Sequence, residues 1–104
     1  MSDQAVQFVE STGIDVKTAV ATAILAVNDL FGKEQINNIL LEEVDFAELP
    51  PRWKVTIGYD RPKTHAQGGP LSAALALASN SYERVYRVVS IDAASGKVRS
   101  IKMR

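Results

Sequence analysis

Four carboxylates lie close together in one short segment of the chain: Glu42, Glu43, Asp45 and Glu48. Paired carboxylates can act as general acid and base, or can hold a hard cation such as Ca²⁺ or Mg²⁺. Regular strand alternation directs Glu42 and Glu48 to one side and Glu43 and Asp45 to the other. We therefore favour a solvated acidic strand that faces basic neighbours over a catalytic or metal site.

Other groups with chemical potential are isolated. His65 is the only histidine, near Lys63, and has no acidic cluster close to it in sequence. A metal site or a catalytic base needs several converging groups. The chain has no cysteine, and the Gly68–Pro70 segment lacks the lysine and the strand-to-helix context of a phosphate-binding loop. We predict a protein that is not an enzyme and that binds no metal or cofactor.

Residues 82–104 are rich in basic side chains, with six basic residues and two acidic ones. Because Tyr82 and Tyr86 lie among them, this surface could bind nucleic acid. The whole chain, however, has 12 basic and 12 acidic residues and a formal net charge of zero. Basic side chains on a terminal strand also discourage edge-to-edge aggregation, and we favour that role over nucleic-acid binding.

Length and composition predict one soluble globular domain over residues 1–104, with 46% hydrophobic and 23% charged residues. The N-terminal residues include Asp3 and Glu10 and no basic residue before Lys17, which differs from a secretory signal. The longest low-charge run, residues 18–28, is too short to span a bilayer. We expect a cytoplasmic protein without membrane contact, or an extracytoplasmic one if a leader has been removed.

Apolar residues recur at spacings of three and four between Val16 and Phe31, which predicts an amphipathic helix. Asp15 is the expected N-cap and Gly32 the expected left-handed stop. Residues 3–11 favour a second, short helical segment.

Four segments are typical of strands: residues 39–47, 52–60, 82–92 and 97–103. Leu40, Val44 and Phe46 are expected on one face of the first strand, where Glu42 indicates a bulge or an edge position. Residues 61–81 form an insertion with two prolines and two adjacent glycines. Within it, residues 70–78 could form a small helix with Leu71 and Leu75 on one side.

The last two strands are expected to form a hairpin around residues 93–96, with Gly96 at a positive φ. If Asp92 opposes Lys97, the regular register pairs Ile91 with Val98, Ser90 with Arg99, Val88 with Ile101 and Tyr86 with Met103. Opposed residues share a face. Both faces of this hairpin are then apolar, and one helix can cover only one of them. The other needs the 71–78 segment, a second copy, a ligand or a partner.

The order of elements, the W-x-V-x-I pattern at Trp53, Val55 and Ile57, and the segment "VVSIDAASGKV" resemble the PepSY domain. This family typically ends in a Val-Asp-Ala-x-Thr-Gly-x-Val hairpin, whose positions are taken here by Ile91, Asp92, Ala93, Ser95, Gly96 and Val98. The resemblance implies a helix on an antiparallel sheet and an interaction or peptidase-inhibitory role without catalytic residues. The insertion at 61–81 is longer than the loop usual in that family.

We therefore predict an α+β domain of PepSY/cystatin-like type, with one main helix on a four-stranded antiparallel meander. We expect it to associate through the open sheet face as a homodimer or with a protein partner. The expected contact residues are Tyr86, Val88, Ile101 and Met103, with Arg99 at the rim and Leu71 and Leu75 as a flap. The alternative is a small-molecule pocket between helix and sheet, closed by residues 61–81.

Overall fold

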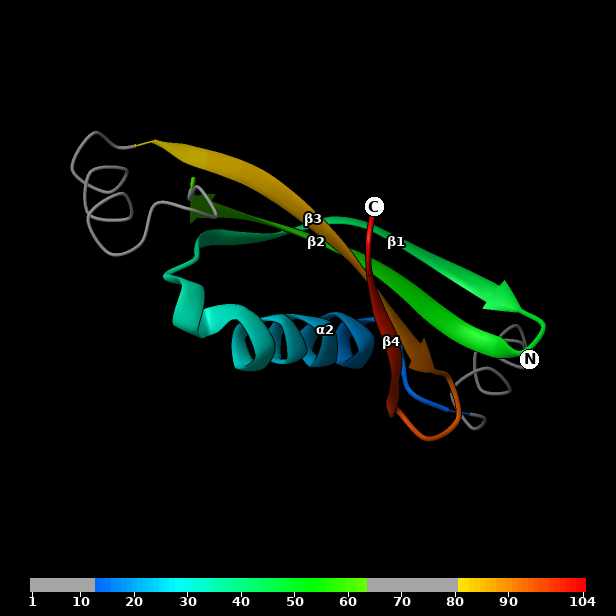
Figure 1. The fold of residues 1–104 in the computed structure, drawn as a ribbon. Helices are drawn as coiled ribbons and strands as arrows, with labels where there is room; N and C mark the ends of the chain where they lie inside the picture. The colour runs from blue at the N-terminus through cyan, green and yellow to red at the C-terminus, as the bar shows by residue number, and fades with distance from the viewer. Residues whose placement is uncertain (1–12, 64–80) are drawn as a thin grey trace.

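A computed structural model describes residues 13–63 and 81–104 of the chain. Its elements are α2 (Val16–Phe31), the 3₁₀ turn η1 (Gly32–Glu34), β1 (Asn37–Glu48), β2 (Pro51–Pro62), β3 (Tyr82–Asp92) and β4 (Val98–Met103). The four strands form one antiparallel sheet in the order β1-β2-β3-β4, and α2 packs against one side of it (Figure 1). We call that side the helix face and the other the open face. The predicted α+β meander is confirmed.

Helix α2 has the bounds that the sequence predicts, but the residue that follows it has another conformation than expected. The Asp15 carboxylate accepts a hydrogen bond from the Thr18 amide at 2.8 Å, so the predicted N-cap is confirmed. Gly32 has φ −59° and ψ −29°, which is helical, so the predicted left-handed stop at this residue is wrong. The chain continues through η1, and Gln35 takes the left-handed conformation at φ 60°.

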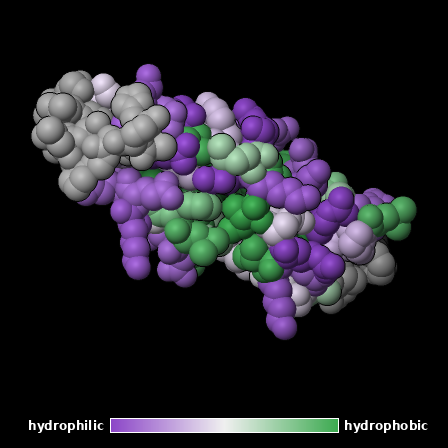
Figure 2. Space-filling model, in the orientation of Figure 1, coloured by the Kyte–Doolittle hydropathy of each residue, from purple (hydrophilic) through white to green (hydrophobic). Residues whose placement is uncertain are grey.

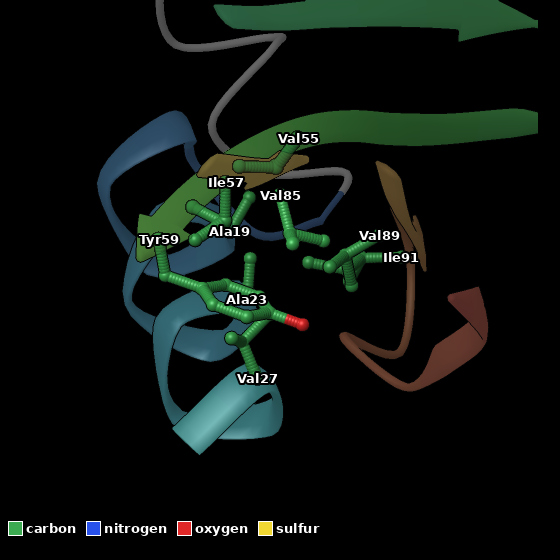
Figure 3. Packing of buried hydrophobic residues seen from close by; sticks show 9 residues of the cluster. All are labelled: Ala19, Ala23, Val27, Val55, Ile57, Tyr59, Val85, Val89 and Ile91. Atoms are coloured by element: carbon green, nitrogen blue, oxygen red, sulfur yellow. The ribbon is translucent and has the colours of Figure 1, made fainter. Parts of the chain in front are cut away.

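The core lies between α2 and the two central strands, and its members share an exposed fraction of 5% or less (Figure 3). They are Ala19, Ala23 and Val27 from the helix and Val55, Ile57, Tyr59, Val85, Val89 and Ile91 from the sheet. The two alanines carry short side chains, which let the helix backbone approach β2 and β3 closely. The Tyr59 hydroxyl accepts a hydrogen bond from Arg87 Nε at 3.0 Å, so the one polar atom of this cluster has a partner.

Strand β1 is an edge strand whose pairing with β2 shifts twice, between Asn37 and Leu40 and between Leu41 and Glu43. The bulge and edge position expected at Glu42 are therefore confirmed. Val44 and Phe46 pair with Val55 and Trp53 on the helix face, as predicted. Leu40 does not join them, because the bulge places Leu41 opposite Ile57 and Leu40 opposite Gly58 on the open face.

The hairpin of β3 and β4 turns where the sequence predicts, with Gly96 at φ 77°. The predicted pair Ile91–Val98 is confirmed. The next pairs are Ser90–Ser100, Val89–Ile101 and Arg87–Met103, with a register shift after Ile91. The regular register was therefore wrong beyond Val98, because Arg99 is an extra, bulged residue.

The inserted segment begins later than the sequence suggests, because Arg61 and Pro62 still belong to β2. The Lys63 amide donates to the Ser81 carbonyl at 3.0 Å, which closes the described ends of this connection. His65, Leu71, Leu75, the small helix expected at 70–78 and the one expected at 3–11 lie outside the described residues.

Candidate functional site

The structure places the residues of the predicted open-face contact on two different faces of the sheet. Tyr86 and Val88 lie on the open face, whereas Ile101 and Met103 follow Val89 and Arg87 onto the helix face. Arg99 lies in the bulge and donates to the Asp92 carboxylate at 3.0 Å. One extra residue in β4 has thus moved two of the four main contact residues to the opposite side of the sheet. The open-face contact as predicted is wrong in its composition.

The open face carries an ion-pair network over its first three strands. Arg84 donates to the Glu42 carboxylate at 3.1 Å, to the Asp60 carboxylate at 3.1 Å and to the Asn38 carbonyl at 2.8 Å. Gly58 makes room for it, because a Cβ there would lie 2.8 Å from the Glu42 carboxylate. Hydrogen bonds from Asn38 and from Arg84 hold the pKa of Asp60 below its ordinary value.

Arg104 forms a second polar bridge on the same face. Its guanidinium lies 4.5 Å from the centre of the Tyr86 ring and 3.8 Å from the Glu43 carboxylate. The acidic strand therefore does face basic neighbours, as the sequence predicts. Its expected alternation fails at Glu42, because the bulge brings Glu42 to the open face with Glu43 and Asp45. Polar and aromatic side chains satisfy one another here, which does not suit an apolar contact surface.

An apolar groove lies instead on the helix face, between α2 and β1. It has a volume of about 450 Å³. Its lining consists of Val16, Lys17, Val20, Ala21, Ile24, Leu41 and Val44. Leu41 is 44% exposed although it lies opposite the buried Ile57. The groove exists because the helix-face side chains of β2 and β3 are buried in the core, whereas Leu41 and Val44 of β1 are only partly covered.

The outer edge of β1 is unpaired among the described strands. The Ala93 amide donates to the Pro51 carbonyl, so the odd-numbered residues of β2 direct their backbone groups toward β3. Even-numbered residues of β2 then bond to β1, where Lys54 faces Asp45. The backbone groups of Val44 and Phe46 therefore point away from the sheet, beside the groove.

Two carboxylates on this edge have no ion-pair partner within 4 Å among the described residues, Asp45 and Glu48. The Phe46 side chain is 47% exposed, although its ring meets that of Trp53 edge to face at 5.0 Å. The edge thus combines open backbone groups, an apolar flank and unpaired negative charge.

The other edge of the sheet, β4, carries the opposite charge. Four basic residues lie on or beside this strand: Lys97, Arg99, Lys102 and Arg104. Hydrophobic residues gather near β4 and the first turns of α2 (Figure 2). Met103 is 57% exposed on the helix face. The Arg104 amide donates to the Tyr86 carbonyl, so the backbone groups of Ile101 and Met103 point outward.

Within the described residues, no three histidine, cysteine, aspartate or glutamate side chains come together as a metal site would require. No helix in residues 13–63 or 81–104 has the length and hydropathy needed to cross a membrane. Comparison with protein-family models, curated proteins and solved structures gives no match. The PepSY resemblance therefore stays a prediction.

The sequence predicts a pocket between helix and sheet as the alternative, but it does not place that pocket beside β1, because Val16, Val20 and Ile24 belong to the same apolar stripe as the core residues. Their signal was present in the width of that stripe, which extends beyond the three fully buried helix positions.

Proposed function

We propose that the chain is a non-catalytic protein-interaction domain that binds an extended partner segment along the outer edge of β1. The observation that carries the proposal is the position of the groove, directly beside outward-facing backbone groups. A strand added to such an edge gains affinity from main-chain hydrogen bonds and specificity from alternate side chains. Apolar side chains of the partner would enter the groove beside Val44 and Leu41.

The negative charge of β1 determines which side chains of the partner segment fit on the open face. Side chains that alternate with the apolar ones would lie on the open face, next to Glu43 and Asp45. Basic side chains at these positions would be attracted, and acidic ones repelled. The domain thus accepts a segment in which apolar and basic residues alternate.

A direct test uses a short synthetic peptide of alternating valine and lysine, and a matched peptide of valine and glutamate. We expect the first peptide to shift the backbone NMR signals of Val44 to Glu48 and to slow their amide exchange. We expect the second to leave them unchanged. Shifts confined to the open face near Tyr86 and Val88, or no shift with either peptide, would contradict the proposal.

A pair of helix variants tests the groove itself. Ala21→Glu places a charge in the groove, and Leu25→Glu places the same charge on an exposed part of the same helix. We expect the first variant to weaken peptide binding by about tenfold, because an unpaired charge in an apolar contact is costly. The second variant should bind like the wild type. Equal effects of both would show that the groove is not used.

The volume of the groove favours a second candidate function, the binding of a small apolar ligand. About 450 Å³ is within the size range of ligand pockets. An apolar fluorescent dye that binds the wild type and not Ala21→Glu, together with no binding of either peptide, would favour this function. The loop at residues 61–81 leaves the sheet at Lys63 and returns to it at Ser81, beyond the end of α2. The residues of its central part are not among those described.

A further inference from the structure

We propose that the extended segment accepted by β1 is strand β4 of a second copy of this chain. Copies would then join edge to edge into one continuous sheet. This inference rests on the proposed function, since it uses the same edge and the same groove, and it identifies the partner.

The side-chain pattern of β4 is the one that the β1 edge requires. Ile101 and Met103 lie on the helix face, and Lys102 lies between them on the open face. An antiparallel pairing that sets Lys102 of the second copy opposite Asp45 brings apolar residues together on the helix face. It places Ile101 beside Phe46 and Met103 beside Val44, at the groove. Met103 is largely exposed in the single chain and is free to enter it.

The charges of the two strands agree with this register. Asp45 and Lys102 are both exposed, and neither has an ion-pair partner within 4 Å among the described residues. Glu43 and Arg104 would also face each other between copies, but they are already within 3.8 Å inside one chain. The pair Asp45–Lys102 is therefore the new electrostatic contact.

The backbone groups also match. Val44 and Phe46 direct their amide and carbonyl groups away from β2, and Ile101 and Met103 direct theirs away from β3, as argued above from the Pro51–Ala93 and Tyr86–Arg104 hydrogen bonds. In the proposed register these four residues form the hydrogen-bonded pairs of an antiparallel ladder. A shift by one residue would bring inward-facing groups to the contact and would exchange the faces of the side chains.

Chain direction permits the arrangement without turning a copy over. In a four-stranded antiparallel meander, β1 and β4 run in opposite directions. An antiparallel contact between them therefore relates the copies by a translation combined with the small rotation that continues the twist of the sheet. Both helices then stay on the same face. The two symmetric alternatives, β1 on β1 and β4 on β4, would bring like charges together.

Charge reversal tests the contact. Asp45→Lys and Lys102→Glu each replace the attraction between copies by repulsion, and both positions are exposed. By sedimentation velocity over a concentration series, we expect the wild type to associate and each variant to do so about tenfold more weakly. An equimolar mixture of the two variants restores opposite charges at every contact and should associate like the wild type.

Matched controls carry the same charge changes away from both strand edges. Asp29→Lys on α2 and Lys33→Glu in η1 lie at exposed positions and should associate like the wild type. A mixture of edge variants that associates no better than either alone would overturn the inference, as would an effect of the controls equal to that of the edge variants.

A backbone variant provides a second, independent measurement. Met103→Pro removes an outward-facing amide and leaves the bonds to β3 in place, whereas Met103→Ala keeps the amide. We expect the proline variant to associate less than the alanine variant. If the wild type stays monomeric at every concentration while the valine–lysine peptide still binds β1, the inference fails and the proposed function stands. If neither association nor peptide binding is found, both fail.

Discussion

Asp92 shows how much a single carboxylate organises at the end of β3. It accepts hydrogen bonds from the Ser95 amide at 2.8 Å and the Ser95 hydroxyl at 2.9 Å, and it pairs with Arg99 at 3.0 Å. The bonds from Ser95, followed by that from Arg99, hold the pKa of Asp92 below its ordinary value. The same residue therefore fixes both the turn and the bulge.

The lowered pKa of Asp92 predicts that the folded protein becomes less stable in acid. Because the folded chain favours the charged carboxylate, its stabilising effect is complete above about pH 5 and is lost as the pH falls below about 4. We expect Asp92→Asn to unfold at lower urea concentrations than the wild type near neutral pH. The two urea midpoints should converge in acid, and midpoints that stay equally far apart at every pH would contradict this account.

Two glycines predict opposite responses to the same substitution. A Cβ on Gly13 would overlap the Ala93 carbonyl oxygen, which also accepts the Ile14 amide at 2.8 Å. We expect Gly13→Ala to lower the free energy of unfolding by about 2 kcal/mol, because backbone atoms must separate. Gly32→Ala should be neutral or stabilising by about 0.5 kcal/mol, because Gly32 is helical and has only the Asn28 side chain near it. Chemical denaturation of the two variants checks both values.

At the scale of elements, the distance between α2 and the sheet is set by small side chains. Ala19 and Ala23 are fully buried against the central strands. We expect Ala23→Leu to lower the free energy of unfolding by about 1–3 kcal/mol, because the added atoms overpack the contact. Leu25→Ala, on the exposed side of the same helix, should change it by less than about 0.5 kcal/mol. Equal losses in urea unfolding would show that the helix is not held at a fixed distance.

The elements that depend on local pattern could be predicted from the sequence. The spacing of Val16 to Phe31, the cap at Asp15 and the turn at Gly96 are local signals, and the structure confirms them. The bulge at Arg99 could not be predicted, because it depends on contacts of Asp92 that a regular register does not contain. A pocket between helix and sheet was among the predictions, but its position beside β1 was not, because that position depends on how far α2 reaches across the sheet, which is a tertiary property.

At the scale of the whole molecule, a formal net charge of zero hides an asymmetric distribution. The acidic strand and the basic strand were visible in the sequence, but only the strand order places them on opposite edges of one sheet. The proposed edge-to-edge contact replaces the expected open-face contact and still uses Ile101 and Met103. It also departs from the role expected for the basic terminal strand, because basic side chains that repel an identical edge attract an acidic one.

This distribution predicts how assembly responds to concentration and salt. Because each copy would offer one acidic and one basic edge, the contact does not close on itself as a two-fold dimer does. We expect the average mass in light scattering to rise with concentration without a plateau at the dimer. Added salt should reduce the mass, because the contact depends on exposed charges. A constant dimer mass at all concentrations would contradict the head-to-tail arrangement.

The bulged arginine decides which side chains of the last strand are interior. Deleting Arg99 would join Val98 directly to Ser100, and the isoleucine and methionine would keep their places toward the helix in an unbroken ladder. Straightening the strand without changing its length would instead turn its end over, so that lysine and arginine would face the helix and the isoleucine and methionine would face water.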